Sequence, residues 1–301
     1  MGLFSRSAAV TIALAPDVVT PRQLVTATVT PTRRIDKVSS ATLQWGYTNF
    51  YRYHWAGRVD SVAAAANDTL YHLGEVGTNA GGDRDTDDWI SVTEIALPAP
   101  DGHFDGGGAT FLVPSWAPAS SKEIASWGCR LVIDRAGRDI DTTAEFTVRV
   151  GRADIAADDG PLEVVMGAGE TVIDIALSTK VCTAGSPILG AVTLTPTKDL
   201  PDGDIAVCWQ RHRQSHPLTR TPTSGGSVDG PIVKLGNKIA LRAGSPITIP
   251  FEIALPADAA PTASAVNSSI RWYVAARLFY AGFSAHLPER VIRPIVVVNA
   301  V

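Results

Sequence analysis

An internal repeat constrains the fold of this 301-residue chain more than any other feature of its sequence. A Thr-x-Thr-Pro-Thr motif stands at Thr28–Thr32 and again at Thr193–Thr197, and an Ile-Ala-Leu motif precedes it in both places. A tryptophan follows in each half, Trp45 in the first and Trp209 in the second, and each half closes on a run of β-branched residues. Motifs that recur in the same order mark a duplicated structural unit. The sequence therefore predicts two copies of one domain.

Within each copy the apolar residues alternate with polar ones, as Val25, Ala27 and Val29 illustrate. A period of two is typical of half-buried β-strands, and Gly- and Pro-containing turns separate the segments. One short helix is expected, over Ser61–Tyr71. The pattern predicts an all-β protein with two tandem antiparallel immunoglobulin-like β-sandwich domains. Their expected extents are 1–151 for the first domain, 152–164 for a linker and 165–301 for the second domain.

Several apolar strand motifs occur in the order found in a known superfamily. Thr183–Gly190 resembles that family's Pro-Gly-x-x-Val-x-Gly entry into its second strand, and Ile247–Pro256 is similar to its Phe-x-Phe-x-x-Pro-type strand. Ile270–Ala276 resembles the strand before the final hairpin, while Phe111–Pro114 and Leu131–Asp139 are similar to the amino-terminal domain. The family is the arrestin-like superfamily, whose bacterial members include sporulation-control proteins. The resemblance implies a scaffold or adaptor whose loops bind a partner.

Charge and cysteine content narrow the classes of function. The 26 Lys and Arg residues nearly cancel the 30 Asp and Glu residues, for a net charge of −4, which argues against nucleic-acid binding. The sequence contains no run of about 18 apolar residues, so it predicts no transmembrane helix. The three cysteines lie in apolar segments that resemble strands, and none has Cys-x-x-Cys spacing; they are Cys129, Cys182 and Cys208. They are expected to be buried free thiols of a cytoplasmic protein.

An acidic run is the sharpest candidate for metal chemistry. Its oxygens fall at positions 1, 3, 5, 9 and 12 of a calcium-loop pattern, supplied by Asp83, Asp85, Asp87, Ser91 and Glu94. Position 6 is Asp88 instead of glycine, and neither flank has a helical pattern. We therefore expect an exposed acidic loop that leads into a strand over 89–97, with calcium as the alternative and no other cofactor.

Aromatic residues crowd the segment from Trp45 to Trp55. Strand alternation places most of them on one face, namely Trp45, Tyr47, Tyr51, Tyr53 and Trp55. Core packing is the favoured interpretation, and a groove for carbohydrate or peptide is the alternative.

Two long stretches, 56–88 and 213–237, are expected to be loops at corresponding ends of the two domains. Loops on a rigid scaffold commonly carry binding residues. The hypothesis is a surface for a protein partner formed by Asp83, Asp85, Asp87, Asp88, Arg211, His212, Arg213, His216 and Arg220.

Catalytic motifs are missing from the sequence: it has no Gly-x-Ser-x-Gly elbow and no Gly-x-x-x-x-Gly-Lys loop. No catalytic residue is therefore predicted. The expected function is a non-enzymatic scaffold or adaptor. The alternatives are a calcium-dependent carbohydrate- or lipid-binding module and, more remotely, a metallohydrolase.

Overall fold

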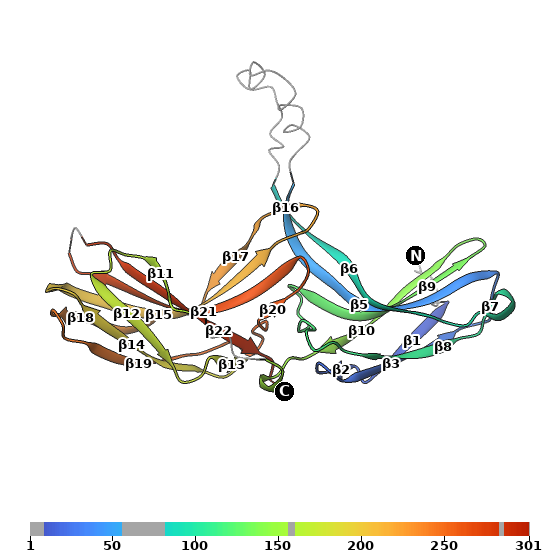
Figure 1. Cartoon of the computed structure of the whole chain (residues 1–301), viewed down its shortest axis with the longest axis horizontal. Helices are drawn as coiled ribbons and strands as arrows, with labels where there is room; N and C mark the ends of the chain where they lie inside the picture. Colours follow the sequence, from blue (N-terminus) through green and yellow to red (C-terminus); the bar gives the residue numbers. More distant parts are fainter. Residues whose placement is uncertain (1–8, 56–81, 156–159, 283–285, 301) are drawn as a thin grey trace, which may run out of the picture. The chain divides into compact units, whose positions relative to one another are not determined.

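The structure is a computed structural model that describes residues 9–55, 82–155, 160–282 and 286–300 (Figure 1). The helix expected over 61–71 lies outside these residues. The described part is all-β apart from two three-residue 3-10 helices, η1 (Pro100–Gly102) and η2 (Arg152–Asp154), so none of its helices has the length or apolar character to cross a membrane.

The chain forms two compact units. Unit 1 contains Met1–Arg149 together with two short segments from later in the sequence, Ser215–Thr223 and Ser264–Ser268. Unit 2 contains the remainder, which is Val150–Gln214, Ser224–Ala263 and Ser269–Val301.

Alternation produces the strands, as the sequence predicted. In β3 (Leu24–Pro31) the side chains of Val25, Ala27 and Val29 are buried and the residues between them are exposed. On the exposed side the hydroxyls of Thr26 and Thr110 lie 3.1 Å apart and form a cross-strand hydrogen bond.

Unit 1 contains two principal sheets. The smaller is antiparallel, in the order β1 (Val10–Ala15), β3, β8 (Gly107–Leu112). The larger has the order β16 (Thr221–Pro222), β5 (Val38–Trp55), β9 (Ala125–Arg135), β10 (Ile140–Val148), β2 (Val18–Val19), with β6 (Gly82–Ala96) also paired to β5. A two-stranded sheet joins β4 (Ile35–Asp36) to β7 (His103–Phe104).

Unit 2 repeats this pairing scheme. Its three-stranded sheet has the order β12 (Thr171–Leu177), β14 (Ile188–Pro196), β19 (Ile247–Ile253). Its larger sheet has the order β11 (Glu163–Met166), β22 (Glu289–Val298), β21 (Ser268–Tyr280), β15 (Leu200–Ser215), β17 (Ser224–Asp229). Three more strands join that sheet: β13 (Val181–Thr183) on β22, β18 (Val233–Leu241) on β15 and β20 (Ala263–Ser264) on β21. The second strand of each repeat pairs in parallel with the last, β2 with β10 and β13 with β22.

Aromatic rings fill the space between the two main sheets of unit 1. The Trp45 ring of β5 stacks on Phe111 of β8, with centroids 5.2 Å apart and an interplanar angle of 10°. Tyr47 and Tyr51 are each 1% exposed, which confirms a core role for this part of the aromatic run. Tyr53 and Trp55 are only half-buried. The described part of the protein is thus an all-β fold whose sheets pack in a manner compatible with β-sandwiches.

A pair of tryptophans marks the core of unit 2. The rings of Trp209 and Trp272 have centroids 5.1 Å apart, and their indole N–H groups donate to the carbonyls of Ala254 and Ala260. A Cβ at Gly230 would overlap the Trp209 ring, so only glycine fits there.

All three thiols are buried and unpaired, as expected. Burial raises the pKa of Cys129 to about 12 and that of Cys182 to about 11. The thiolate, which is the reactive form, is therefore suppressed at neutral pH.

A buried polar network centred on Asn49 of β5 holds the late segments in unit 1. Asn49 is 0% exposed. Its Nδ2 donates to the Ile124 carbonyl at 2.9 Å and to Ser268 Oγ at 2.8 Å, and its Oδ1 accepts the Asn267 N–H at 2.7 Å. The Ser268 hydroxyl donates in turn to the Phe50 carbonyl. The network therefore satisfies buried backbone groups of both the early and the late segments.

Candidate functional site

The acidic run is part of a strand, which corrects the expected loop over 82–88; the rest of that expected loop, 56–81, lies outside the described residues. Strand β6 begins at Gly82, and Asp83, Asp85 and Asp88 pair in register with His54, Arg52 and Asn49 of β5. Residues 213–237 likewise contain β16, β17 and part of β18, so the second expected loop is also largely strand. Cross-strand partners of opposite charge override the weak strand propensity of aspartate.

The carboxylates of β6 are occupied by partners within unit 1. The Arg52 guanidinium donates to both oxygens of Asp85 at 3.2 Å. The Thr223 hydroxyl donates to Asp83 at 2.8 Å, and this bond, with the further interaction of His54, lowers the pKa of Asp83. The acidic surface is thus largely neutralised by its own neighbours.

Asp88 is also engaged. The Tyr51 hydroxyl donates to Asp88 Oδ2 at 2.6 Å, and burial together with this carboxylate raises the pKa of Tyr51 to about 12. The Asn267 side chain donates to the same oxygen at 3.3 Å.

The calcium ligand set does not assemble. Alternate residues of a strand lie about 6.6 Å apart, so Asp83, Asp85 and Asp87 spread along β6 and do not converge on one point. The Ser91 hydroxyl donates to Glu94 at 3.1 Å. Among the described residues, no group of three or more His, Cys, Asp or Glu side chains is placed to hold a metal.

The predicted basic residues are divided between the two units. His216 and Arg220 belong to unit 1, whereas Arg211, His212 and Arg213 belong to unit 2. Arg220 lies over the Tyr53 ring at 4.6 Å, a cation–π contact, and donates to Thr86 Oγ1 at 3.3 Å. The proposed partner surface is therefore not assembled as one set within a single unit.

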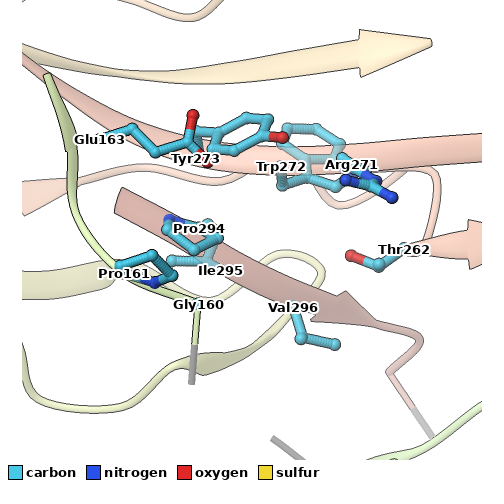
Figure 2. Close-up of a pocket in the computed structure, with 10 residues that line it drawn as sticks. All are labelled: Gly160, Pro161, Glu163, Thr262, Arg271, Trp272, Tyr273, Pro294, Ile295 and Val296. Carbon is cyan, nitrogen blue, oxygen red and sulfur yellow. The ribbon is translucent and has the colours of Figure 1, made fainter. Parts of the chain in front are cut away.

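Unit 2 has a cavity of about 410 Å³ that the sequence did not indicate (Figure 2). It lies where the start of β21, the end of β22 and the chain leading into β11 meet. Its lining consists of Gly160, Pro161, Glu163, Thr262, Arg271, Trp272, Tyr273, Pro294, Ile295 and Val296.

Proline and glycine shape this cavity. Strand β11 pairs with β22 only as far as Ile292, two residues before Pro294, and a proline has no N–H with which to extend a strand ladder. The chain before β11 therefore leaves the sheet at this point. At Gly160 an added Cβ would lie 2.6 Å from Pro294 Cγ, so the close approach of these two walls requires a glycine.

Two opposite charges flank the cavity. Figure 2 shows Glu163 beside the Tyr273 ring and Arg271 on the far side of Trp272. Both charged side chains belong to exposed residues, and neither has an ion pair or side-chain hydrogen bond with another residue in the described ranges. Other charges of unit 2 do have such partners, for example Arg293, which donates to Asp174 at 2.8 Å.

The same sheet face continues beyond the cavity. Alternation along β21 places Arg271, Tyr273, Ala275 and Arg277 on one face. The register with β22 sets Tyr273 opposite Pro294, Ala275 opposite Ile292 and Arg277 opposite Arg290. Cys208, Tyr273, Ala275 and Ile292 form a buried apolar cluster on it.

His212 links the stability of unit 2 to pH. Its ring lies 4.8 Å from that of Tyr273. Burial, followed by repulsion from Arg290, lowers its pKa below 6.5, and the attraction of Asp229 and Glu163 offsets this only in part. The unfolded chain then binds more protons than the folded one below about pH 6.5. We expect the free energy of unfolding to fall as the pH drops through this range, and His212→Gln to remove part of the fall in urea denaturation. An identical pH dependence in the variant would contradict this.

Sequence reasoning singled out His212 but missed Glu163, Arg271, Tyr273 and Pro294. The alternation of Arg271, Tyr273 and Arg277 was visible in the sequence and marks one strand face. The close approach of Gly160 to Pro294 could not be predicted from the sequence, because it depends on pairing between strands that are distant in the chain. Comparison with known proteins gives no family: no protein-family model matches the chain, and no curated protein does.

Proposed function

We propose that the protein is a non-enzymatic adaptor, built from two immunoglobulin-like β-sandwiches of the arrestin-like kind, that binds an extended segment of a protein partner. The observation that carries the proposal is the cavity of unit 2, with apolar and aromatic walls and an unpartnered charge on either side. Binding sites for peptides and small ligands commonly combine apolar walls with a few placed polar groups.

The chemistry of the cavity indicates its occupant. Its two prolines, Pro161 and Pro294, offer rigid apolar surface above the buried Tyr273, which is typical of the centre of a protein interface. Arg271 can pair with an acidic residue of the partner, and Glu163 can pair with a basic one. The charges beside the cavity therefore fit a segment that carries one acidic and one basic residue. The buried free thiols support a cytoplasmic location as part of this proposal.

Repeated strand pairing supports the sandwich assignment. In each unit a three-stranded sheet and a larger sheet follow one connection scheme. In unit 1 the stacked Trp45 and Phe111 rings join the two layers. These features are those of a duplicated two-layer β domain, with 1–151 and 165–301 as the proposed domain extents.

A displayed library of peptides of about eight residues, selected on the full chain, tests the proposed binding. A segment of this length spans about 25 Å when extended. We expect the selected peptides to carry one basic and one acidic residue, and Arg271→Glu and Glu163→Lys each to weaken their binding about tenfold or more, measured by calorimetry.

Arg242→Glu is the matched control, because Arg242 is an exposed arginine that does not line the cavity. It makes the same change in net charge and is expected to leave binding unchanged. Failure to select any peptide, or equal binding by the parent and both charge-reversed variants, would overturn the proposal.

A further inference from the structure

Two arginines of unit 2 lie beside a single carboxylate, and only one of them donates to it. Arg277 and Arg290 lie directly opposite each other on β21 and β22. Arg277 Nη2 donates to Asp229 Oδ2 at 2.7 Å. Arg290 Nη2 donates to the neutral Gln210 Oε1 at 2.8 Å, and Gln210 Nε2 donates to the other oxygen of Asp229 at 2.6 Å. Arg290 thus has no carboxylate partner within the described part of the chain.

Unit 1 provides an internal comparison. There Arg130 of β9 donates through two nitrogens to both oxygens of Asp141, so that one guanidinium matches one carboxylate. In the unit 2 cluster, two guanidinium groups face one carboxylate, and the Nε of both arginines has no hydrogen-bond partner among the described residues. The unit 2 cluster therefore retains a net positive charge.

This arrangement costs stability. Like charges directly opposite each other on neighbouring strands repel. The side chain of Arg277 is only 26% exposed, which limits screening by water. The buried floor of Cys208, Ala275 and Ile292 keeps the surroundings apolar and strengthens any charge–charge interaction above it.

We propose that Arg277 and Arg290, with Gln210 beside them, form a binding site for an oxyanion, either a carboxylate or a phosphate group. The planar guanidinium presents paired N–H donors that match two oxygens of such a group. Gln210 is 1% exposed and bonded on both sides, so it fixes the orientation of Arg290 and Asp229 before the anion arrives. Asp229 competes with the ligand for Arg277 and limits its affinity.

Titration of the full chain with inorganic phosphate and with acetate, followed by calorimetry and by the melting temperature, tests this site. We expect phosphate to bind and to raise the melting temperature. Arg290→Gln should weaken binding about tenfold or more. Asp229→Asn should strengthen it several-fold, because it removes the competing carboxylate. This opposite sign separates a ligand site from a merely structural cluster.

Two short peptides distinguish the sources of the oxyanion: one carries an Asp-Glu pair and the other a phosphoserine in its place. The peptide that binds more tightly to the parent protein, and loses this binding in Arg290→Gln, identifies whether the oxyanion is a carboxylate or a phosphate group. Arg130→Gln, in the fully matched pair of unit 1, is the control and should leave phosphate and peptide binding unchanged. Arg242→Glu, at an exposed arginine outside both sites, should also leave phosphate binding intact. The two proposals can fail separately, because peptide selection tests the cavity and phosphate titration tests this cluster.

The proposal is overturned if neither phosphate nor any carboxylate binds, or if the parent and Arg290→Gln bind equally. If Arg290→Gln fails to fold, Asp229→Asn decides the matter, because unchanged or weaker binding in that variant contradicts the site.

Discussion

Replacement of Trp127 by alanine is expected to lower the free energy of unfolding of unit 1 by about 4 kcal/mol. Trp127 of β9 is 0% exposed, and its ring centroid lies 4.9 Å from that of Tyr47 and 6.1 Å from that of Phe146. Its indole N–H donates to the Pro118 carbonyl at 2.8 Å. The substitution therefore opens a cavity and leaves a carbonyl without its partner. Urea denaturation followed by circular dichroism, with hydrogen exchange to locate the loss, measures the effect.

A second tryptophan of the same core supplies the control. Trp45 is also 0% exposed, but its indole N–H has no hydrogen-bond partner among the described residues. Tryptophan-to-phenylalanine substitutions at 45 and 127 remove similar volumes, and only the second breaks a hydrogen bond. We expect Trp127→Phe to cost about 1 kcal/mol more than Trp45→Phe. Equal losses would show that the bond to Pro118 contributes nothing.

The Asn49→Leu substitution is expected to lower the free energy of unfolding by about 3 kcal/mol or more. It leaves a buried backbone N–H without an acceptor and removes the two hydrogen bonds that the Asn49 side chain donates. The Asn267 N–H would lose its acceptor, and the Ser268 hydroxyl would lose one of its two partners. The same denaturation measurement tests this, with hydrogen exchange expected to show loss of protection over Ser264–Ser268.

Thr48→Ala is the control for Asn49→Leu. Thr48 precedes Asn49 on β5, is only half-buried and points to the opposite face of the strand. It should change stability by less than about 0.5 kcal/mol. A loss below about 1 kcal/mol in Asn49→Leu would mean that water replaces the network at little cost.

Local alternation was sufficient to predict most strands and much of the core. Val25, Ala27 and Val29 are buried as the pattern indicates, and so are Trp45 and the three thiols. Such predictions succeed because burial on one face of a strand is encoded within a few neighbouring residues.

Local alternation did not predict the charged strand β6 or the contacts between residues distant in sequence. Asp83 and Asp85 have low intrinsic strand propensity, and it is their pairing with His54 and Arg52 that places them in β6. The cavity of unit 2 depends on Gly160 approaching Pro294, which are distant in sequence. No residue that lines the cavity was predicted as a site residue; His212, which was predicted for the partner surface, lies outside the lining and next to one of its members, Tyr273.

The late segments of unit 1 have a consequence for biosynthesis. A ribosome that has produced the first 149 residues has not yet made β16 or Asn267 and Ser268, so the nascent chain emerges with the Asn49 side chain lacking its late partners and one edge of β5 unpaired near His54. Contacts between residues so far apart in sequence slow folding and prolong the exposure of strand edges. The order of synthesis thus delays completion of the first unit until more than half of the second has been translated, and it prolongs the interval in which this edge of β5 is open to aggregation.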